Sequence, residues 1–401
     1  MKTLLLTFML IATAAGATTP LQVYSLHADT LAAARTRLAQ GDSALAPALE
    51  HLRGEADRAL KFQPVSVMDK SRTPPSGDKH DYLSQAPYWW PDPSKPDGLP
   101  YIRHDGKHNP EVDHGTDAPV WGRMSSAVET LGLAFYFTHK EAYAEHAALL
   151  IRTWFLNPAT RMNPNLNFGQ YVPGRNEGRG EGVLALRSLA EICDTLSLIT
   201  GSPAWSTADD QAFREWLAAY LKWLTTSSVG LEEAHATNNH GSWYDMQAAD
   251  IALVLGQTDF ARKILTDGLE KRLAIQVMPD GSQPQELART KSLGYSLFNL
   301  QALCKLATLA EHVDIDWWGY ATKDGRSLRA ALRYLAPYAD PDKPWIKSDL
   351  VAGGRTDLLP LFAEALRHGD DAQFRELLAK FGNTAGQQSA RWRLLLDMPP
   401  H

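Results

Sequence analysis

The stretch Thr237–Tyr244 gathers side chains that can move protons or bind an anion. It reads Thr-Asn-Asn-His-Gly-Ser-Trp-Tyr, which places two carboxamides, an imidazole and a phenol close together. If a helix begins near Asn239, then His240 and Tyr244 lie on one face, because residues four apart share a helix face. Asn239 then stands in the first helical turn, where free N–H groups favour an anion. A plain helix cap, with Thr237 and Asn238 as capping residues and His240 in the core, explains the same pattern.

The segment Gln285–Ser296 adds an arginine and a second tyrosine. It follows a Pro-Asp-Gly turn and leads into an apolar helical pattern. Arg289 and Tyr295 are six residues apart, so they do not share a face of one continuous helix. They converge if Arg289 lies in the loop and Tyr295 on the helix that follows. Otherwise the arginine is a solvated surface charge and the tyrosine a core residue.

The loop 157–182 is rich in asparagine, arginine and glycine. Its polar side chains include Asn165, Asn167, Arg175, Asn176 and Arg179. Amide and guanidinium N–H groups are donors that carboxylates accept, so this loop is a candidate for binding an acidic substrate. The simpler interpretation is a glycine-rich turn with its arginines on the surface.

Together these groups suit β-elimination at a 4-linked uronic acid. Asparagine or arginine neutralises the carboxylate so that the C5 proton becomes acidic, a base removes that proton, and an acid protonates the departing O4. A tyrosine, with a reference pKa of about 10, becomes a better base when nearby cations lower that value. Arg289 and a protonated His240 are such cations for Tyr295. This set requires no metal and no cofactor.

The segment 63–117 is long, irregular and rich in proline and aromatic residues, and we expect it to line a groove. Within it, Trp89 and Trp90 either stack on sugar rings or pack the segment onto the protein body. Four further side chains are of types that bind metals: His104, His108, Asp113 and His114. Their spacing fits no standard zinc pattern, so we expect no metal site.

Amphipathic helical patterns follow one another along most of the chain. Helices are expected at residues 26–62 (with a break near 41), 120–138, 141–156, 183–200, 207–224, 239–255, 260–275, 292–312, 327–335, 357–367 and 371–381. Ser206 or Thr207 is the expected N-cap of the helix that begins near 207. No convincing strand pattern is present. The sequence therefore predicts an all-α fold, an α/α toroid or incomplete barrel whose loops line a groove at one mouth, as a single domain over residues 18–401.

Composition limits the partners and the location of the protein. The 401 residues carry a formal net charge of −6, which argues against a general nucleic-acid-binding protein. Residues 1–17 have the pattern of a secretory signal peptide, and no later apolar run is long enough to span a membrane. We therefore expect a periplasmic or secreted protein. Cys193 and Cys304 each lie in a helical pattern and are expected to be buried free thiols.

Three motifs resemble the alginate lyase domain superfamily. They are the Asn-Asn-His-Gly-Ser-Trp-Tyr stretch, the Arg-x5-Tyr pair, and the Pro-Tyr-Trp-Trp-Pro-Asp-Pro segment that begins at Pro87. The chain is most similar to polysaccharide lyase family 38, which is related to the family 5 alginate lyases, over residues 82–300. This resemblance implies an α/α toroid that cleaves alginate or a similar polyuronate, polymannuronate above all, without a metal.

The resemblance also implies roles for individual residues. Tyr295 matches the catalytic tyrosine, His240 the catalytic histidine, and Arg289 the arginine that supports the tyrosine. The carboxylate neutraliser is either Asn239 or a loop asparagine, Asn176 or Asn167. Substrate contacts are expected from these loop, helix and aromatic side chains: Asn167, Arg175, Arg179, Tyr244, Trp89, Trp90 and Asn238.

Other activities are consistent with parts of the pattern. A glucuronan lyase of the same fold uses the same elimination geometry. A glycoside hydrolase on an α/α toroid needs two carboxylates at the scissile bond, and the candidates Glu177, Glu181, Asp245 and Glu286 are not paired by any recognisable motif. A non-catalytic polysaccharide-binding protein is disfavoured by the intact set of tyrosine, histidine, arginine and asparagine. An anionic polysaccharide is the partner common to the lyase interpretations.

Overall fold

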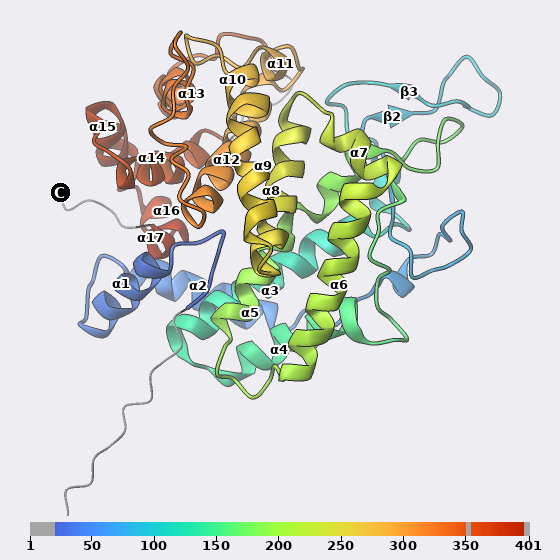
Figure 1. Ribbon diagram of the computed structural model, residues 1–401, viewed down its shortest axis with the longest axis horizontal. Helices are drawn as coiled ribbons and strands as arrows, with labels where there is room; N and C mark the ends of the chain where they lie inside the picture. The colour runs from blue at the N-terminus through green and yellow to red at the C-terminus, as the bar shows by residue number, and fades with distance from the viewer. Residues whose placement is uncertain (1–20, 350–353, 397–401) are drawn as a thin grey trace, which may run out of the picture.

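Helices make up most of the chain in the computed structural model, which describes residues 21–349 and 354–396 (Figure 1). In order they are α1 (Ala28–Ala39), α2 (Ala46–Ala59), α3 (Ala118–Thr138), α4 (Glu141–Ile151), α5 (Leu189–Leu198), α6 (Thr207–Thr226), α7 (Ser228–Ala234), α8 (Asn239–Val254), α9 (Thr258–Gly268), α10 (Ala274–Gln276), α11 (Pro284–Leu287), α12 (Ser292–Glu311), α13 (Leu328–Leu335), α14 (Leu358–Arg367), α15 (Ala372–Phe381), α16 (Ala385–Gln388) and α17 (Trp392–Leu395). α3, α6, α8 and α12 match the ranges expected from periodicity, whereas the helix expected at 183–200 is α-helical only from Leu189 and the one expected at 260–275 has α9 ending at Gly268. The predicted all-α toroid is confirmed.

The inner helices differ from the outer ones in sequence. Apolar and small residues occur on all sides of α8 and α12, and most side chains of both helices are buried. These two helices pack against each other, and α3 packs against α2, α4 and α5. By contrast α6 has one apolar face and one polar face, and it lies at the periphery (Figure 1). Its predicted cap is confirmed, since the side chain of Ser206 accepts from the N–H of Asp209.

Short strands, which the sequence did not predict, tie the irregular segments together. β1 (Leu83–Gln85) pairs in parallel with β4 (Phe168–Tyr171), and β2 (Trp89–Trp90) pairs in antiparallel with β3 (Ile102–Arg103). Each strand is too short to show an alternating pattern. The parallel pair joins segment 63–117 to the loop 157–182, so the two long loops lie side by side. Figure 1 shows β2 and β3 projecting beyond α7 at the edge of the toroid.

One cluster of buried apolar side chains extends from Val23 to Leu394. Cys193 and Cys304 are buried and unpaired, as the sequence predicts. None of the helices in the described ranges is long and apolar enough to cross a membrane. The expected signal peptide falls outside the described residues.

Candidate active site

A cavity of about 810 Å³ opens where the long loops meet the first turns of α8 and α12. From α8 it is lined by Asn239 and His240, with the capping residue Asn238 beside them. From the other wall it is lined by Arg289 and Tyr295. The loops contribute Tyr88, Trp89 and Arg179. The structure thus brings together four of the five residues expected to be catalytic.

Tyr295 stands in the first turn of α12, and Arg289 lies in the loop just before that helix. The two side chains can therefore meet although they are six residues apart. This is the arrangement that the sequence requires for them to converge. The Arg289 guanidinium lies 3.8 Å from the centroid of the Tyr295 ring. The Tyr295 hydroxyl donates to the Tyr88 hydroxyl at 2.9 Å. The phenol is thus held between a cation on its face and a second phenol at its oxygen.

Asp105, which the sequence argument missed, holds Arg289 in place. Nε of Arg289 lies 3.1 Å from both carboxylate oxygens of Asp105, and Nη2 lies 2.7 Å from Oδ1. The backbone N–H and hydroxyl of Thr290 also donate to this carboxylate. Burial alone would raise the pKa of Asp105, but the hydrogen bonds from Arg289 and Thr290 hold it well below its usual value. The segment that carries β2 and β3 is thereby attached to the start of α12.

The acidity of Tyr295 differs from the expectation. The sequence predicts that nearby cations lower the pKa of Tyr295, and Arg289 does act in that direction. Burial nevertheless raises the pKa of Tyr295 well above its usual value, and the hydrogen bond donated to Tyr88 raises it further. In the free site Tyr295 is therefore a neutral phenol that is ready to donate a proton. The expected lowering of the Tyr295 pKa is wrong, because burial of the phenol raises this pKa more than the Arg289 guanidinium lowers it.

His240 is oriented by a carboxylate that was also not predicted. Its Nδ1 lies 2.6 Å from Oε1 of Glu233, and Glu233 is buried at the end of the short helix α7. A carboxylate only accepts, so Nδ1 carries the proton, and in the neutral ring Nε2 keeps its lone pair. His240 lines the cavity, so this hydrogen bond leaves Nε2 as the ring nitrogen that can accept a proton.

Asn239 is fixed by a second buried carboxylate. Its backbone N–H and its Nδ2 donate to the two oxygens of Glu286 at 2.8 and 2.7 Å. An Asn side chain has two N–H groups on Nδ2, so one remains for a ligand. Asn238 is at the same time the N-cap of α8, because its side chain accepts from the N–H of His240 at 3.3 Å. The segment therefore caps α8 and lines the cavity at the same time, although the sequence presented these as two alternative interpretations.

The loop asparagines do not reach this cavity. Oδ1 of Asn176 accepts from the N–H of Val172, and Oδ1 of Asn167 accepts from Nε1 of Trp223. Both residues are exposed, and neither is among the cavity-lining residues. Both side chains are engaged in hydrogen bonds that hold the loop, as is common for asparagine in turns. Of the three candidates for the carboxylate neutraliser, only Asn239 lines the cavity.

The arginines of the same loop surround Trp89. Its ring lies 4.9 Å from the guanidinium carbon of Arg175 and 5.8 Å from that of Arg179. Nε of Arg175 donates to the carbonyl of Tyr101, and this side chain is outside the cavity lining. Arg179 lines the cavity and is held by Gln170 and Glu181.

Gly178 explains how Arg179 is placed. A Cβ at this glycine would lie 1.9 Å from the carbonyl oxygen of Asn167, so no other residue fits without moving the backbone. The close approach of the two chain segments presents the following arginine to the cavity.

Two expected substrate contacts lie elsewhere. Tyr244 shares the His240 face of α8 but lies one turn deeper, where its hydroxyl donates to the carbonyl of Leu224 at 3.1 Å. Tyr244 therefore belongs to the core. The sequence could not show this, because helical periodicity indicates which face a residue is on but not how far along the helix the cavity extends. Nε1 of Trp90 donates to the carbonyl of Lys107, and Trp90 does not line the cavity. Both side chains position their own elements.

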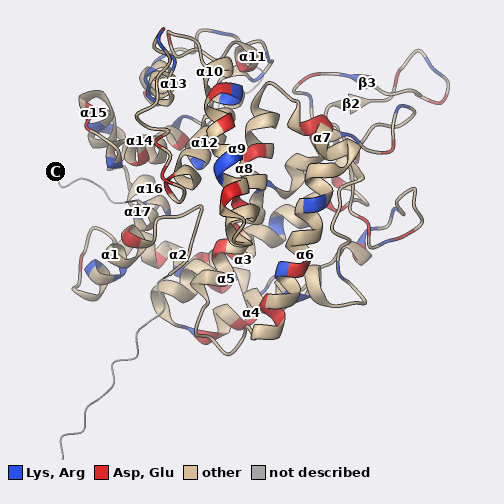
Figure 2. Ribbon diagram, in the orientation of Figure 1, with Lys and Arg blue, Asp and Glu red and all other residues tan. Residues whose placement is uncertain are grey.

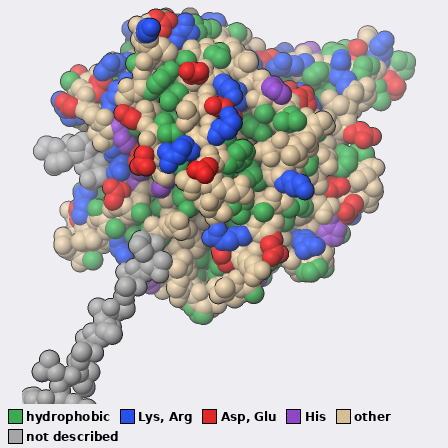
Figure 3. Space-filling view, viewed as in Figure 1, with side chains coloured by type: hydrophobic (Ala, Val, Ile, Leu, Met, Phe, Trp, Pro, Cys, Tyr) green, Lys and Arg blue, Asp and Glu red, His purple; other side chains and the backbone are tan. Residues whose placement is uncertain are grey.

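Positive charge dominates the cavity lining. Its cationic side chains are Arg103, Arg179, Arg187, Arg289 and Lys291, and its carboxylates are Glu181, Glu232 and Glu233. Each carboxylate has a local partner: Arg179 for Glu181, the N–H of Gly180 for Glu232, and His240 for Glu233. On the face of the molecule drawn in Figures 2 and 3, acidic and basic residues are interspersed. A chain with net negative charge therefore has a local site for an anion, and Arg187 and Lys291 add to it without having been predicted.

The hydrolase candidates are engaged in other interactions. Asp245 is buried in a pair with Arg272, in which Nε and Oδ2 are 2.7 Å apart. Glu286 binds Asn239, and Glu177 is exposed outside the cavity lining. Within the described residues, none of these groups forms a pair of carboxylates flanking the cavity. The arrangement instead offers an acid at Tyr295, a base at Nε2 of His240, and N–H donors for a carboxylate.

Known proteins that are similar to this chain are alginate lyases. The family model for alginate lyase matches residues 66–345. The chain is similar to the crystal structure of an alginate lyase from Bacteroides ovatus, with 41% sequence identity and a TM-score of 0.89 over 94% of this chain and 99% of that chain. A comparison with curated proteins found no match.

More distant structures share the fold. Alginate lyase A1-III from Sphingomonas species A1 is 20% identical, with a TM-score of 0.59 over 92% of this chain and 95% of that chain. A complex of A1-III with a tetrasaccharide is 19% identical, with a TM-score of 0.60 over the same shares of the two chains. Since the family model spans well over half of the chain and the Bacteroides ovatus relative aligns along nearly all of it, this protein belongs to the alginate lyase family and is a polysaccharide lyase.

Proposed function

We propose that the protein cleaves alginate by β-elimination, with Tyr295 and His240 as the groups that transfer protons. The observation that carries this proposal is the cavity itself, where a phenol, an imidazole with a free Nε2 and the Asn239 carboxamide face a cationic lining. A polyuronate carries one carboxylate per sugar, which suits such a lining. The alginate lyase from Bacteroides ovatus, at 41% identity, supports the choice of alginate.

The first requirement is neutralisation of the substrate carboxylate. The second N–H on Nδ2 of Asn239 is available to donate to it, and Arg179 lies in the same cavity. As the C5 proton leaves, negative charge moves onto the carboxylate oxygens. N–H donors that are already fixed stabilise this charge without reorganising, and Glu286 fixes Asn239 in this way.

Guluronate is the substrate for which both groups start in the required protonation state. In guluronate the C5 proton and O4 leave from opposite sides, so two different groups are needed. Nε2 of His240 takes the C5 proton, and the neutral Tyr295 donates its proton to O4 as that bond breaks. Glu233 stabilises the imidazolium that forms.

Mannuronate requires a different use of Tyr295. Its C5 proton and O4 leave from the same side, so one group acts first as base and then as acid. Tyr295 must then start as a phenolate, which takes the C5 proton and returns it to O4. We propose that mannuronate-rich alginate is the favoured substrate once the pH is high enough to populate this phenolate.

Trp89 is the candidate for sugar binding. Its ring lines the cavity, and within the described residues its Nε1 is buried without a hydrogen-bond partner. This N–H therefore does not face the open cavity, and the indole ring is the part of Trp89 on which a sugar can stack.

One assay tests the proposal directly. The protein is incubated with polymannuronate, polyguluronate, glucuronan and a neutral glucan, and ultraviolet absorbance of the C4–C5 double bond is recorded. Absorbance with the two alginate polymers is the expected result. Absorbance with glucuronan alone would identify a glucuronan lyase, and new reducing ends without absorbance would contradict elimination.

We also propose that the protein is exported. The apolar segment near the N-terminus, followed by Ala15-Gly16-Ala17, carries this proposal. N-terminal sequencing of the mature protein from the periplasmic and culture fractions tests it, with cleavage before Thr18 as the expected result.

A further inference from the structure

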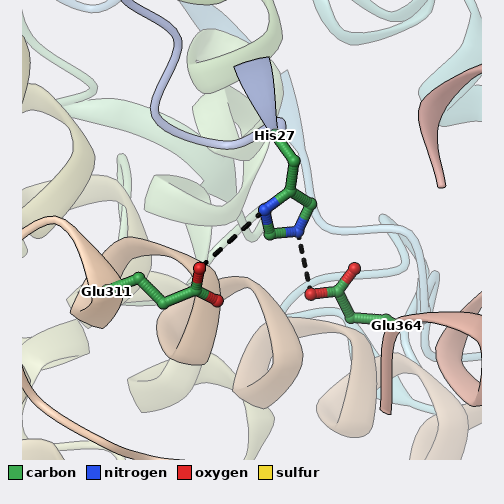
Figure 4. A group of neighbouring side chains, drawn as sticks. All are labelled: His27, Glu311 and Glu364. Atoms are coloured by element: carbon green, nitrogen blue, oxygen red, sulfur yellow. Dashed lines mark hydrogen bonds and ion pairs between the residues drawn. The ribbon is translucent and has the colours of Figure 1, made fainter. Parts of the chain in front are cut away.

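A cluster of two histidines and two glutamates joins the first helix to the C-terminal helices, far from the cavity described above. His27 is the N-cap of α1, Glu311 is the last residue of α12, and Glu364 and His368 lie on α14 and at its C-cap. The His27 side chain makes no capping hydrogen bond to its own helix. Its ring instead lies between the two carboxylates (Figure 4).

The donor atoms of this cluster are close to one another. Nε2 of His27 lies 2.8 Å from Oε1 of Glu364, and Nδ1 lies 3.9 Å from Oε2 of Glu311. Nε2 of His368 lies 3.3 Å from a carboxylate oxygen of each glutamate. One donor atom each from His27, Glu311 and Glu364 fits within 4.8 Å of the other two. In the described residues this is the only group of metal-ligand side chains with such spacing.

We propose that His27, His368, Glu311 and Glu364 bind a divalent transition-metal ion of the zinc class. Zinc bonds to nitrogen and oxygen of about 2.0–2.2 Å put neighbouring ligand atoms of a tetrahedron roughly 3.3 Å apart. The contacts of His368 with both glutamates already have this length, and that of His27 with Glu364 is close to it. His27, Glu311 and Glu364 already offer one donor atom each within 4.8 Å of one another, and a movement of the His368 ring toward His27 adds the fourth donor.

The donor types favour zinc over calcium or magnesium. Two carboxylates balance the charge of a divalent ion, and two imidazole nitrogens are ligands that calcium and magnesium do not prefer. The histidine rings are also supported. The indole of Trp318 stacks on His368 with ring centroids 4.9 Å apart and an angle of 6° between the planes. Packing around the ligands restricts their rotation and so favours binding.

An ion can reach this site from solvent. A cavity of about 650 Å³ is lined by His27 and Glu311 together with Arg367. The Glu311 side chain is 38% exposed, whereas those of His27 and Glu364 are 9% and 7% exposed. The site is therefore open on the Glu311 side and closed on the other. Arg367 is engaged with Asp29 and Thr30.

The ion would have a structural role. Tyr295 and Glu311 are sixteen residues apart on α12, which corresponds to about 24 Å along the helix. Tyr295, the proposed acid, is therefore out of reach of the metal. Binding instead links α1, α12 and α14, so it stabilises the folded chain by mass action and leaves the elimination chemistry unchanged.

The test uses the full mature chain after treatment with a chelator. Isothermal titration with Zn²⁺ is expected to show one ion per chain. Thermal unfolding is expected to show a higher midpoint with Zn²⁺, whereas Ca²⁺ causes neither effect. Co²⁺ is expected to give the visible absorption of a tetrahedral site. Glu364→Gln and His368→Gln should each weaken Zn²⁺ binding by roughly 10- to 100-fold.

A matched control distinguishes this site from ordinary surface binding. His51 and Glu55 also form a histidine–glutamate pair on one helix, with Nε2 and Oε1 3.5 Å apart, and no second histidine pairs with them in the described part of the chain. His51→Gln should bind Zn²⁺ like the unmodified chain. Unaltered binding in the more exposed His368→Gln, or no stoichiometric Zn²⁺ binding at all, would overturn the proposal. The cluster would then be a network of ion pairs without a metal.

Discussion

Arg289 contacts Tyr295 through the face of its guanidinium and Asp105 through the edge. The face lies 3.8 Å from the phenol ring centroid, and the edge makes two contacts of 3.1 Å and one of 2.7 Å with the carboxylate. Asp105 and Arg289 are 184 residues apart in sequence. The position of Tyr295, the proposed acid, therefore depends on a loop that is distant in the chain, and this dependence can be measured.

Replacement of Tyr295 by phenylalanine should abolish the formation of unsaturated product. The variant keeps the ring beside Arg289 but lacks the hydroxyl that donates a proton to O4. The rate should therefore fall by a factor on the order of 10² to 10⁴. Initial rates from ultraviolet absorbance measure this effect. Tyr244→Phe is the control, since it removes a core hydroxyl that donates to Leu224 and should cost about 1 kcal/mol of stability with little loss of rate. Activity near that of the unmodified enzyme in Tyr295→Phe would exclude the assignment.

Asp105→Ala should lower the turnover number more than it lowers stability. Without this carboxylate Arg289 can leave the phenol ring, and misplacement of a catalytic side chain by about 1 Å can cost on the order of 10²-fold in rate. The ion pair is partly exposed, so the loss of unfolding free energy should be about 1 kcal/mol or less. Steady-state kinetics and urea unfolding measure the two quantities. Asp97→Ala, which removes an exposed carboxylate from the same segment, should change neither.

Glu233→Gln should distinguish the two polymers. Glutamine can accept from Nδ1 of His240 but does not stabilise an imidazolium, so guluronate cleavage should fall by about 10²-fold and mannuronate cleavage much less. The neighbouring Glu232→Gln is the matched control, because Glu232 lines the same cavity but binds the N–H of Gly180. His240→Ala should show the same preference more strongly. Equal losses on both polymers would contradict separate roles for the histidine and the tyrosine.

Mannuronate cleavage should keep rising with pH through the neutral range. Burial and the hydrogen bond to Tyr88 raise the pKa of Tyr295, so the phenolate that starts this route is scarce at neutral pH and becomes more abundant as pH increases. Tyr88→Phe removes the acceptor that favours the neutral phenol. In this variant the pKa of Tyr295 should be lower, and the profile of kcat/KM against pH should move to lower pH. A profile that is unchanged, or that moves to higher pH, would contradict this account.

Helical periodicity predicted the fold well because each inner and outer helix has its own pattern. The nearly uniform apolar surroundings of α8 and the single apolar face of α6 are local properties of the sequence. The pairing of β1 with β4 was not predictable, since two strands of three and four residues have no periodicity to detect. The short helix α7 was missed for the same reason.

The candidate site was predictable where its residues are close in sequence. Asn239 with His240, and Arg289 with Tyr295, lie within short segments that turn into helices. Asp105 and Glu286 act across long sequence separations, so no local pattern indicates them. Glu233 is only seven residues from His240, but its signal is weak because glutamates near helix ends are common on surfaces.

Tyr295 and His240 both stand in the first turns of α12 and α8, which pack against each other along the centre of the toroid. The separation between the two proposed proton carriers is therefore set by the packing of two buried helices, whereas loops supply Tyr88, Trp89 and Arg179 to the cavity. The helix pair and the loops can thus change separately. A loop 157–182 grafted from a relative that keeps an arginine at the position of Arg179 should change which polyuronate is accepted, while the spacing of Tyr295 and His240 stays the same.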